Sequence, residues 1–298
     1  MKPVRRIASL LLALLLVLPL ANVSFAAKEK GEPVGGNLIK LGTLEDFEKG
    51  TLTNATASAS DVSDGAVRLA EGQTDGEYAS QIFEVEPFEY LVASWNAEVP
   101  AGTYVEVKAR AYVDMKKTWT EWLSWGKWSR DVAERGSANT ETELAGVDTD
   151  IFTVYGSDGE TASLVQLKVV LHSDDPSVTP VLEQVAATYK NTLEGQAIQP
   201  SLAYSLYDGQ LPEKVEPNCP AISQMVREPS IADVICSATT ICTLLNAHGE
   251  DLLPEQVALL CYDSNYEGFG NWPFSVAVAG MFGYDAYVQL SLIHISEP

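Results

Sequence analysis

Apolar and polar residues alternate strictly in several segments of the N-terminal part of the chain. Between residues 104 and 113, valine or alanine fills every second position, and tyrosine, glutamate, lysine or arginine fills the positions between. Residues 164–172 repeat this alternation, and residues 90–99 and 181–189 are typical of further strands. Because side chains alternate across a strand, each segment predicts a strand with one buried face. Many short strands without intervening helices predict an all-β sandwich, jelly-roll-like, over residues 36–191.

The pattern changes beyond this region. Residues 192–218 contain glycines and prolines but no sustained periodicity, which predicts a linker. The following segment predicts three helices: one over 237–247 with a glycine just past its end, one opened by Pro254, and one opened by Pro273. A strand is predicted to begin at 286–289. Helices followed by strands are the order of an α+β domain, so the fold class is multidomain, with the second domain over 219–289.

Four tryptophans spaced by threes stand out within the predicted sandwich: Trp119, Trp122, Trp125 and Trp128. Their rings could stack on sugar rings, as a carbohydrate-binding surface requires, or they could fill the core of the sandwich. A period of three matches neither a strand face nor a helix stripe, so at least some of these rings are expected to point outward. Both interpretations stay open at the level of sequence.

Charge excludes some partners. The chain has 19 Lys and Arg against 41 Asp and Glu, and such an acidic protein repels nucleic acid and anionic membranes. Asp148 and Asp150 could hold a structural calcium ion, but a solvated turn before the next strand is the simpler interpretation. His172 lies on the outward phase of its strand, which predicts a solvated surface histidine. We expect no cofactor and no metal.

Both ends of the chain differ in character from the rest. Basic residues, an apolar run over 7–20 and the small residues before position 27 predict a secretory signal peptide over residues 1–26. A retained membrane anchor is the alternative, although the apolar run is short for a span. Residues 290–298 resemble a translated sequencing-library adaptor, so we expect a non-native tail that interrupts the native sequence within a domain. The mature protein is expected to be secreted, extracellular or associated with the cell wall.

The four cysteines all follow the predicted linker. Cys236 and Cys242 would point to different sides of one helix and should not form a disulfide, whereas a bridge between Cys219 and Cys261 stays open. Cys236 opens the first predicted helix, where the helix N-terminus favours a thiolate, and Gln224 precedes it by twelve residues and could donate to an oxyanion. Without this context, Cys236 would be interpreted as a buried core cysteine.

Three segments carry a family resemblance: Ile-Ser-Gln-Met at 222–225, Cys-Ser-Ala-Thr-Thr at 236–240, and the glycine- and aromatic-rich run at 266–277. In order and spacing they resemble the secreted relatives of the bacteriocin-processing cysteine peptidases (peptidase C39-like), which are papain-like in fold. The tryptophan-rich sandwich also resembles the region that often precedes such peptidases. The resemblance implies that Cys236 is the nucleophile and Gln224 the oxyanion donor, and it gives Asn271 and Trp272 a structural or cleft-lining role. Ala238 departs from the pattern, since the family usually has proline there.

The family's Gly-His and Asn-Asp-Pro segments have no counterpart in this sequence. His248 follows Cys236 by twelve residues on the same predicted helix, which places it about 18 Å away along the axis. His172 belongs to the sandwich and His294 to the tail. Residues 219–289 therefore match only the N-terminal half of a papain-like domain, and we expect the chain as it stands to be inactive.

Two functions follow from these observations. The first is a secreted cysteine peptidase that acts on a peptide or protein and is brought to a cell-wall or extracellular polysaccharide by the sandwich. The second is a non-catalytic exported carbohydrate- or surface-binding protein whose hydrolase domain is degenerate. For either function we expect no nucleic-acid partner, and no membrane partner once the signal peptide has been cleaved.

Overall fold

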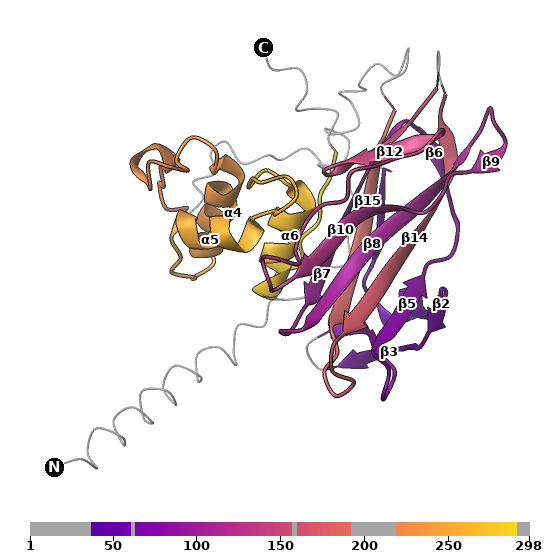
Figure 1. Ribbon diagram of the computed structural model, residues 1–298, viewed down its shortest axis with the longest axis horizontal. Coiled ribbons are helices and arrows are strands. Elements are labelled where there is room, and N and C mark those ends of the chain that lie inside the picture. Colours follow the sequence, from indigo (N-terminus) through magenta and orange to yellow (C-terminus); the bar gives the residue numbers. More distant parts are fainter. Residues whose placement is uncertain (1–36, 61–62, 157–159, 192–218, 291–298) are drawn as a thin grey trace, which may run out of the picture. The chain divides into compact units, whose positions relative to one another are not determined.

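The computed structural model describes residues 37–60, 63–156, 160–191 and 219–290. Two antiparallel sheets and a set of short helices make up this part of the chain (Figure 1). The predicted signal peptide, the predicted linker and the tail from residue 291 lie outside the described residues. None of the helices described is long and apolar enough to cross a membrane.

The first sheet has eight strands. Its order is β11-β12-β13-β7-β15-β4-β3, and β1 also pairs with β15. The strands are β1 (Leu38–Leu41), β3 (Ala55–Ser60), β4 (Ser63–Leu69), β7 (Tyr90–Glu98), β11 (Thr140–Glu141), β12 (Ala145–Asp148), β13 (Ile151–Val154) and β15 (Val181–Lys190).

The second sheet has seven strands. Its order is β10-β8-β14-β5-β2, with β6 paired to β14 and β9 paired to β8. The strands are β2 (Thr51–Thr53), β5 (Asp75–Ala79), β6 (Phe83–Phe88), β8 (Thr103–Val113), β9 (Thr118–Trp119), β10 (Leu123–Ser129) and β14 (Ala162–Ser173). A short helix, α2 (Leu44–Glu48), lies between β1 and β2 and is capped at its N-terminus by Thr43.

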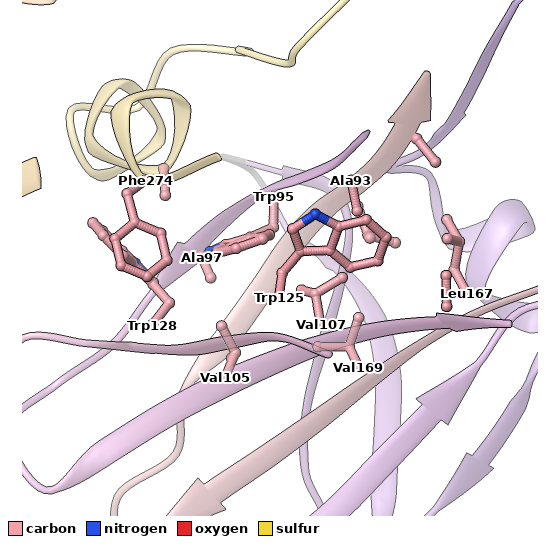
Figure 2. Close-up of a cluster of buried hydrophobic side chains, with 14 of the residues drawn as sticks. Ala93, Trp95, Ala97, Val105, Val107, Trp125, Trp128, Leu167, Val169 and Phe274 are labelled. Atoms are coloured by element: carbon pink, nitrogen blue, oxygen red, sulfur yellow. The ribbon is translucent and has the colours of Figure 1, made fainter. Parts of the chain in front are cut away.

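The core lies between the two sheets, and the predicted alternation is confirmed. Every second residue of β8 from Thr103 onward is buried, and β14 repeats the pattern over most of its length. The two strands pair in register, with Val107 opposite Val169, so their buried side chains form one continuous apolar layer (Figure 2). The β-sandwich predicted from the sequence is therefore present.

The tryptophans divide between core and surface. Trp125 and Trp128 are fully buried and lie with Trp95 in the core (Figure 2). The interpretation that Trp125 and Trp128 stack on sugar is therefore wrong, because neither ring has an exposed face. Trp119 and Trp122 are half-buried, and for these two the interpretation stays a prediction.

The three helices predicted after the linker are confirmed. They are α4 (Cys236–Ala247), α5 (Pro254–Cys261) and α6 (Trp272–Met281), and a 3-10 turn, η2 (Gln224–Val226), precedes them. Within the described residues 219–290 no named strand occurs, so the α+β architecture expected for this segment stays a prediction. Helix α6 packs against β7 of the eight-stranded sheet.

The strand predicted at 286–289 is wrong. These residues form no strand in the structure. Alternate backbone groups bind polar side chains of β7 and β15 instead: the amide of Ala286 donates to Asn96 Oδ1 (3.2 Å), that of Val288 to Ser94 Oγ (3.0 Å), and that of Leu290 to Thr188 Oγ1 (3.1 Å). Side chains on the face of the sheet thus accept the hydrogen bonds of these backbone amides, as a neighbouring strand otherwise would.

Candidate active site and its contacts with the sandwich

Cys236 is exposed and is the first residue of α4. The residue before it, Ile235, offers no side-chain cap to the helix. The N–H groups in the first turn of a helix lack intrahelical acceptors, and together they carry a partial positive charge. The Cys236 thiol thus lies where solvent can reach it and where a helix terminus favours negative charge.

Gln224 opens the 3-10 turn η2 and is half-buried. Its side-chain Nε2 donates to the carbonyl of Ala232 (2.8 Å), which fixes η2 to the loop just before α4. A glutamine amide carries a second N–H that can serve another acceptor. No hydrogen bond joins Gln224 to Cys236 in the described part of the chain, so their pairing at one site stays a prediction.

The described residues place no histidine beside Cys236. His248 is the C-terminal cap of α4, at the opposite end of the helix from Cys236, and its ring lies against Tyr284. His294 lies outside the described residues.

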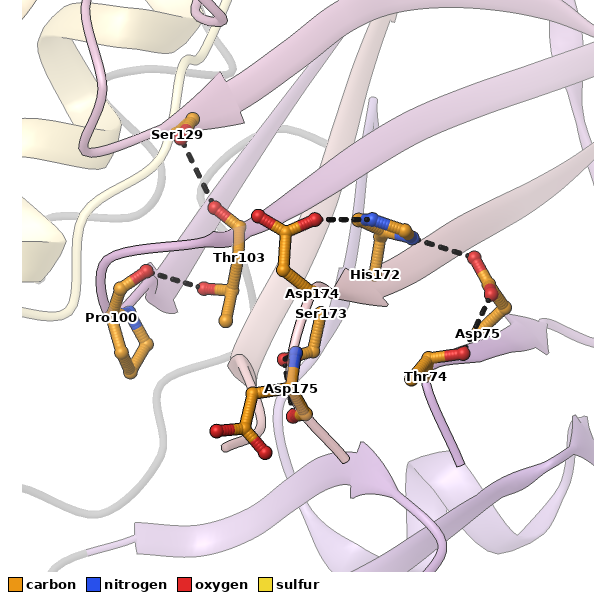
Figure 3. Close-up of polar contacts among 9 residues, drawn as sticks. All are labelled: Thr74, Asp75, Pro100, Thr103, Ser129, His172, Ser173, Asp174 and Asp175. Carbon is orange, nitrogen blue, oxygen red and sulfur yellow. Dashed lines mark hydrogen bonds and ion pairs between the residues drawn. The ribbon is translucent and has the colours of Figure 1, made fainter. Parts of the chain in front are cut away.

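His172 projects from β14 as predicted, and 27% of its side chain is exposed. Its Nδ1 lies 2.6 Å from Asp75 Oδ1 and its Nε2 3.4 Å from Asp174 Oδ1 (Figure 3). The ring also stacks on Tyr104. The hydrogen bond from His172 is the main reason why the pKa of Asp75 is lowered.

Asn271 is a structural residue. Only 1% of it is exposed, and its Oδ1 caps α6 by accepting the amide of Phe274 (3.1 Å). The cleft-lining interpretation is wrong for Asn271, because its buried side chain is used within the protein. Trp272, 44% exposed, keeps that interpretation as a prediction.

A chain of hydrogen bonds leads from Asn271 to the start of α4. The Ser275 hydroxyl donates to the Asn271 carbonyl (3.1 Å) and lies 2.8 Å from the hydroxyl of Ser237. Ser237 directly follows Cys236 in the first turn of α4. The N-terminal turns of α6 and α4 are therefore joined beside the candidate nucleophile.

Asp263 connects this series of hydrogen bonds to the sandwich. It is fully buried, and its Oδ2 accepts from Asn271 Nδ2 (2.9 Å). Its Oδ1 accepts the amide of Ser137, which belongs to the sandwich (2.9 Å), and the amides of Asn265 and Tyr266 (3.1 Å each). A single carboxyl group thereby holds residues from both parts of the chain.

Arg135 forms a second connection. It is almost fully buried, and its guanidinium donates to the carbonyls of Leu259 (2.7 Å) and Tyr262 (2.9 Å) at the C-terminal end of α5. A cation is favoured at a helix C-terminus, where carbonyls lack intrahelical donors. Burial lowers the pKa of Arg135 from its usual value. The ring of Trp128 lies 5.3 Å from the guanidinium carbon.

Asp150 makes a third polar connection. Its Oδ2 accepts the amide of Trp272 at the start of α6 (3.2 Å). Burial is the main reason why the pKa of Asp150 is raised. The segment around Asp148 and Asp150 is a turn between β12 and β13, as preferred from the sequence. No group of three or more metal-ligating side chains occurs in the parts of the chain that are described.

An apolar contact accompanies these polar ones. Phe274 of α6 is fully buried, with its ring centroid 5.2 Å from that of Trp128 and 6.1 Å from that of Trp95 (Figure 2). The sequence did not reveal Arg135 or Asp263 as important residues. Only Asp263 left a local signal, because an aspartate that binds the amides two and three residues later is typical of a turn.

Comparisons with known proteins identify the first part of the chain. Several solved structures resemble the sandwich at low identity. One is TmCBM61 in complex with beta-1,4-galactotriose, with 10% sequence identity and a TM-score of 0.33; the match covers 52% of this chain and 100% of that chain. Another is the C-terminal CBM6 of LamC from Zobellia galactanivorans, with 13% sequence identity and a TM-score of 0.26; the match covers 51% of this chain and 99% of that chain. At these TM-scores the likeness supports no conclusion about ligands. No curated protein matches the sequence. The family model for the peptidase C39 N-terminal domain matches residues 40–189, half of the 298-residue chain. The chain therefore belongs to the peptidase C39 N-terminal domain family.

Proposed function

We propose that the chain is part of a secreted cysteine peptidase in which Cys236 is the nucleophile. The observation that carries this proposal is the exposed thiol at the first residue of α4, in a chain whose sandwich belongs to a peptidase family. A buried core cysteine, the alternative for a lone cysteine in an apolar helix, is not exposed in this way.

The proposed reaction is acyl transfer. Cys236 Sγ, as a thiolate, attacks the carbonyl carbon of a peptide bond, and the carbonyl oxygen becomes an oxyanion. The second N–H of the Gln224 amide is the proposed donor to this oxyanion. The amine leaves with a proton from a general acid, and water then hydrolyses the thioester to release the acid and regenerate the thiol.

This reaction requires a base near Cys236 to take the thiol proton and return it to the amine. The described residues supply no histidine for this role, since His248 lies at the other end of α4. The proposal therefore includes a histidine, and an Asp or Asn to orient it, supplied from outside the described residues. Without that base the thiol is poorly activated.

The proposal is tested by measuring peptide hydrolysis with the protein that the complete source gene encodes. Cys236→Ser should lower thiol-dependent hydrolysis of a peptide library by about a thousandfold or more. Cys219→Ser is the matched control, because Cys219 is also exposed and free but lies outside the helices. Equal hydrolysis in the wild-type protein and Cys236→Ser would exclude Cys236 as the nucleophile.

A second candidate function is glycan binding on the outer face of the seven-stranded sheet. Trp119 and Trp122 are half-buried there, with the Arg110 guanidinium carbon 4.6 Å and 4.8 Å from their ring centroids. A groove of about 560 Å³ also opens beside that sheet; its lining includes Tyr104, Lys127, His172 and Asp174. Aromatic rings beside polar groups suit a ligand with apolar and hydroxyl-bearing faces.

Affinity electrophoresis in soluble polysaccharides tests this second candidate. Trp119→Ala combined with Trp122→Ala should abolish any retardation of the protein by a polysaccharide. Tyr287→Ala is the control, since it removes a partly exposed ring from a different surface. Retardation that survives the double substitution would rule out the two tryptophans as the binding surface.

A further inference from the structure

The sandwich and the first turn of α4 are linked by one continuous series of hydrogen bonds through side chains and backbone groups, which we call the Asp263 network. It runs from the Ser137 amide through Asp263, Asn271 and Ser275 to Ser237, with successive distances of 2.9, 2.9, 3.1 and 2.8 Å. The next residue toward the helix N-terminus is Cys236. The network begins in the sandwich and ends beside the candidate nucleophile.

The inner members of the network are shielded from water. Asp263 is 0% exposed, Asn271 is 1% exposed and Ser275 is 4% exposed. Buried polar groups lose more than exposed ones when a partner is removed, because no water replaces it. The geometry of the network is thus strongly specified. A displacement of the Asp263 carboxyl group would therefore change the position of Ser237, because the buried groups between them cannot exchange their partners for water.

The loops on either side of Asp263 are also in close contact. A Cβ added at Gly136 would come within 2.6 Å of Asn265 Nδ2, so the sandwich loop approaches as only glycine allows. Asn265 Nδ2 donates to the Ser137 carbonyl (2.7 Å), and the Ser264 amide donates to the Arg135 carbonyl (3.2 Å). Together these contacts fix the position of the Asp263 carboxyl group relative to the sandwich.

We infer that Asp263 is a positioning residue, through which the sandwich sets the orientation of the α4 N-terminus and of the Cys236 thiol. The inference takes the role of Cys236 from the proposed function. The sandwich is then a structural part of the site rather than an appended module. Asp263 itself does not touch the reacting atoms; it acts through Asn271, Ser275 and Ser237.

The donor and acceptor roles in the network allow a reciprocal test. In Asp263→Asn, the new amide cannot accept from all three backbone amides and also accept from Asn271 Nδ2. In Asn271→Asp, two carboxyl groups face each other in a buried position. The double variant Asp263→Asn with Asn271→Asp restores one donor and one acceptor between the two positions. An aspartate is also a good helix cap, so α6 keeps its N-terminal hydrogen bond.

The readout is the alkylation rate of Cys236 by iodoacetamide, divided by that of Cys219 in the same full chain and measured by mass spectrometry. Both thiols are exposed, so Cys219 is an internal reference. Asp263→Asn should lower this ratio about two- to fivefold, the range expected when a charge loses its alignment with a helix terminus. The double variant should restore it. Asp251→Asn, which changes an exposed carboxylate of the same segment, should leave it unchanged.

Ser275→Ala cuts the network between α6 and α4 without altering the sandwich contacts, and it should lower the ratio in the same way. If Asp263→Asn does not fold, this variant decides the outcome. An unchanged ratio in folded Ser275→Ala, or a double variant that fails to restore the ratio, would overturn the inference. Alkylation needs no hydrolysis, so an inactive full-length protein would end the proposed function without deciding this result.

Discussion

Arg135 and Asp150 show how single residues attach the helical segment to the sandwich. The Arg135 guanidinium faces the carbonyl end of α5, and the Asp150 carboxylate faces the amide end of α6. Each charge has the sign that a helix terminus favours. These two sandwich residues therefore hold α5 by its C-terminal end and α6 by its N-terminal end.

Replacing Arg135 should destabilise the fold strongly. Arg135→Met fills much of the same volume but leaves the carbonyls of Leu259 and Tyr262 without their buried donor. We expect the free energy of unfolding to fall by about 2–4 kcal/mol in urea titrations, because unpaired buried polar groups are costly. Arg130→Met is the control, since Arg130 is exposed. A loss as small as that of the control would show that these hydrogen bonds contribute little.

Asp150 gives a pH dependence with a definite sign. Burial raises its folded-state pKa above the usual 3.8, so the native state keeps this proton at pH values where the unfolded chain has lost it. The contribution of Asp150 to stability is then complete below pH 3.8 and declines as pH rises toward the folded-state pKa. Asp150→Asn does not titrate, so its stability relative to wild type should increase between pH 3 and pH 7. A relative stability that decreases with pH would contradict this assignment.

At the scale of elements, segment 284–290 shows how a backbone can be satisfied without a strand partner. Asn96 and Gln184 project from neighbouring strands, and both Nδ2 of Asn96 and Nε2 of Gln184 donate to the Ala286 carbonyl (2.9 Å each). Buried amide side chains thus replace the ladder of a sheet. Helix α6 also packs closely against Asn96, since a Cβ added at Gly280 would come within 2.8 Å of this residue.

Amide hydrogen exchange should report this alternation. The amides of Ala286 and Val288 have buried side-chain acceptors, whereas those of Asp285 and Tyr287 are given none by the described residues. We expect exchange at Ala286 and Val288 to be at least about tenfold slower, because a closed hydrogen bond must open first. Equal exchange at all four amides would mean that the segment does not rest on the sheet.

Periodicity predicted the elements of this fold well where one face is buried. Alternation located β8 and β14, and cap residues with proline located α4, α5 and α6 within one residue. The segment at 286–289 has the composition of a strand, but its acceptors are side chains distant in sequence, which no local pattern reveals. The burial of Trp128 likewise depends on its contact with Phe274 of α6, and that of Trp125 on its contact with Phe152 of β13.

The candidate site was predictable only in part. The position of Cys236 at the start of a helix was visible in the sequence, whereas its exposure was not. The Asp263 network was not, because Ser137 and Asp263 are far apart along the chain and carry no shared motif. Contacts of this kind form when two distant segments pack against each other. A single sequence does not show how the two segments are placed relative to one another.

For the molecule as a whole, the sandwich and the helical segment share one core. The apolar cluster that includes Trp95 and Trp128 also includes Phe274, Val278, Cys261 and Cys242 from the helices. Polar groups on both sides of this contact are paired through Asp263, Arg135 and Asp150. A shared core of this kind unfolds cooperatively, since neither part can expose its face alone without cost.

The most direct test of this account is to follow urea unfolding of the full chain with two probes, tryptophan fluorescence for the sandwich and alkylation of Cys261 for the helical segment. Cys261 is fully buried, and burial raises its pKa to about 12, so it should not react in the native state. We predict that Cys261 becomes reactive at the same urea midpoint at which tryptophan fluorescence changes. Reactivity of Cys261 at a clearly lower urea concentration, with the fluorescence still native, would show that the helical segment opens independently and that the sandwich does not hold it in place.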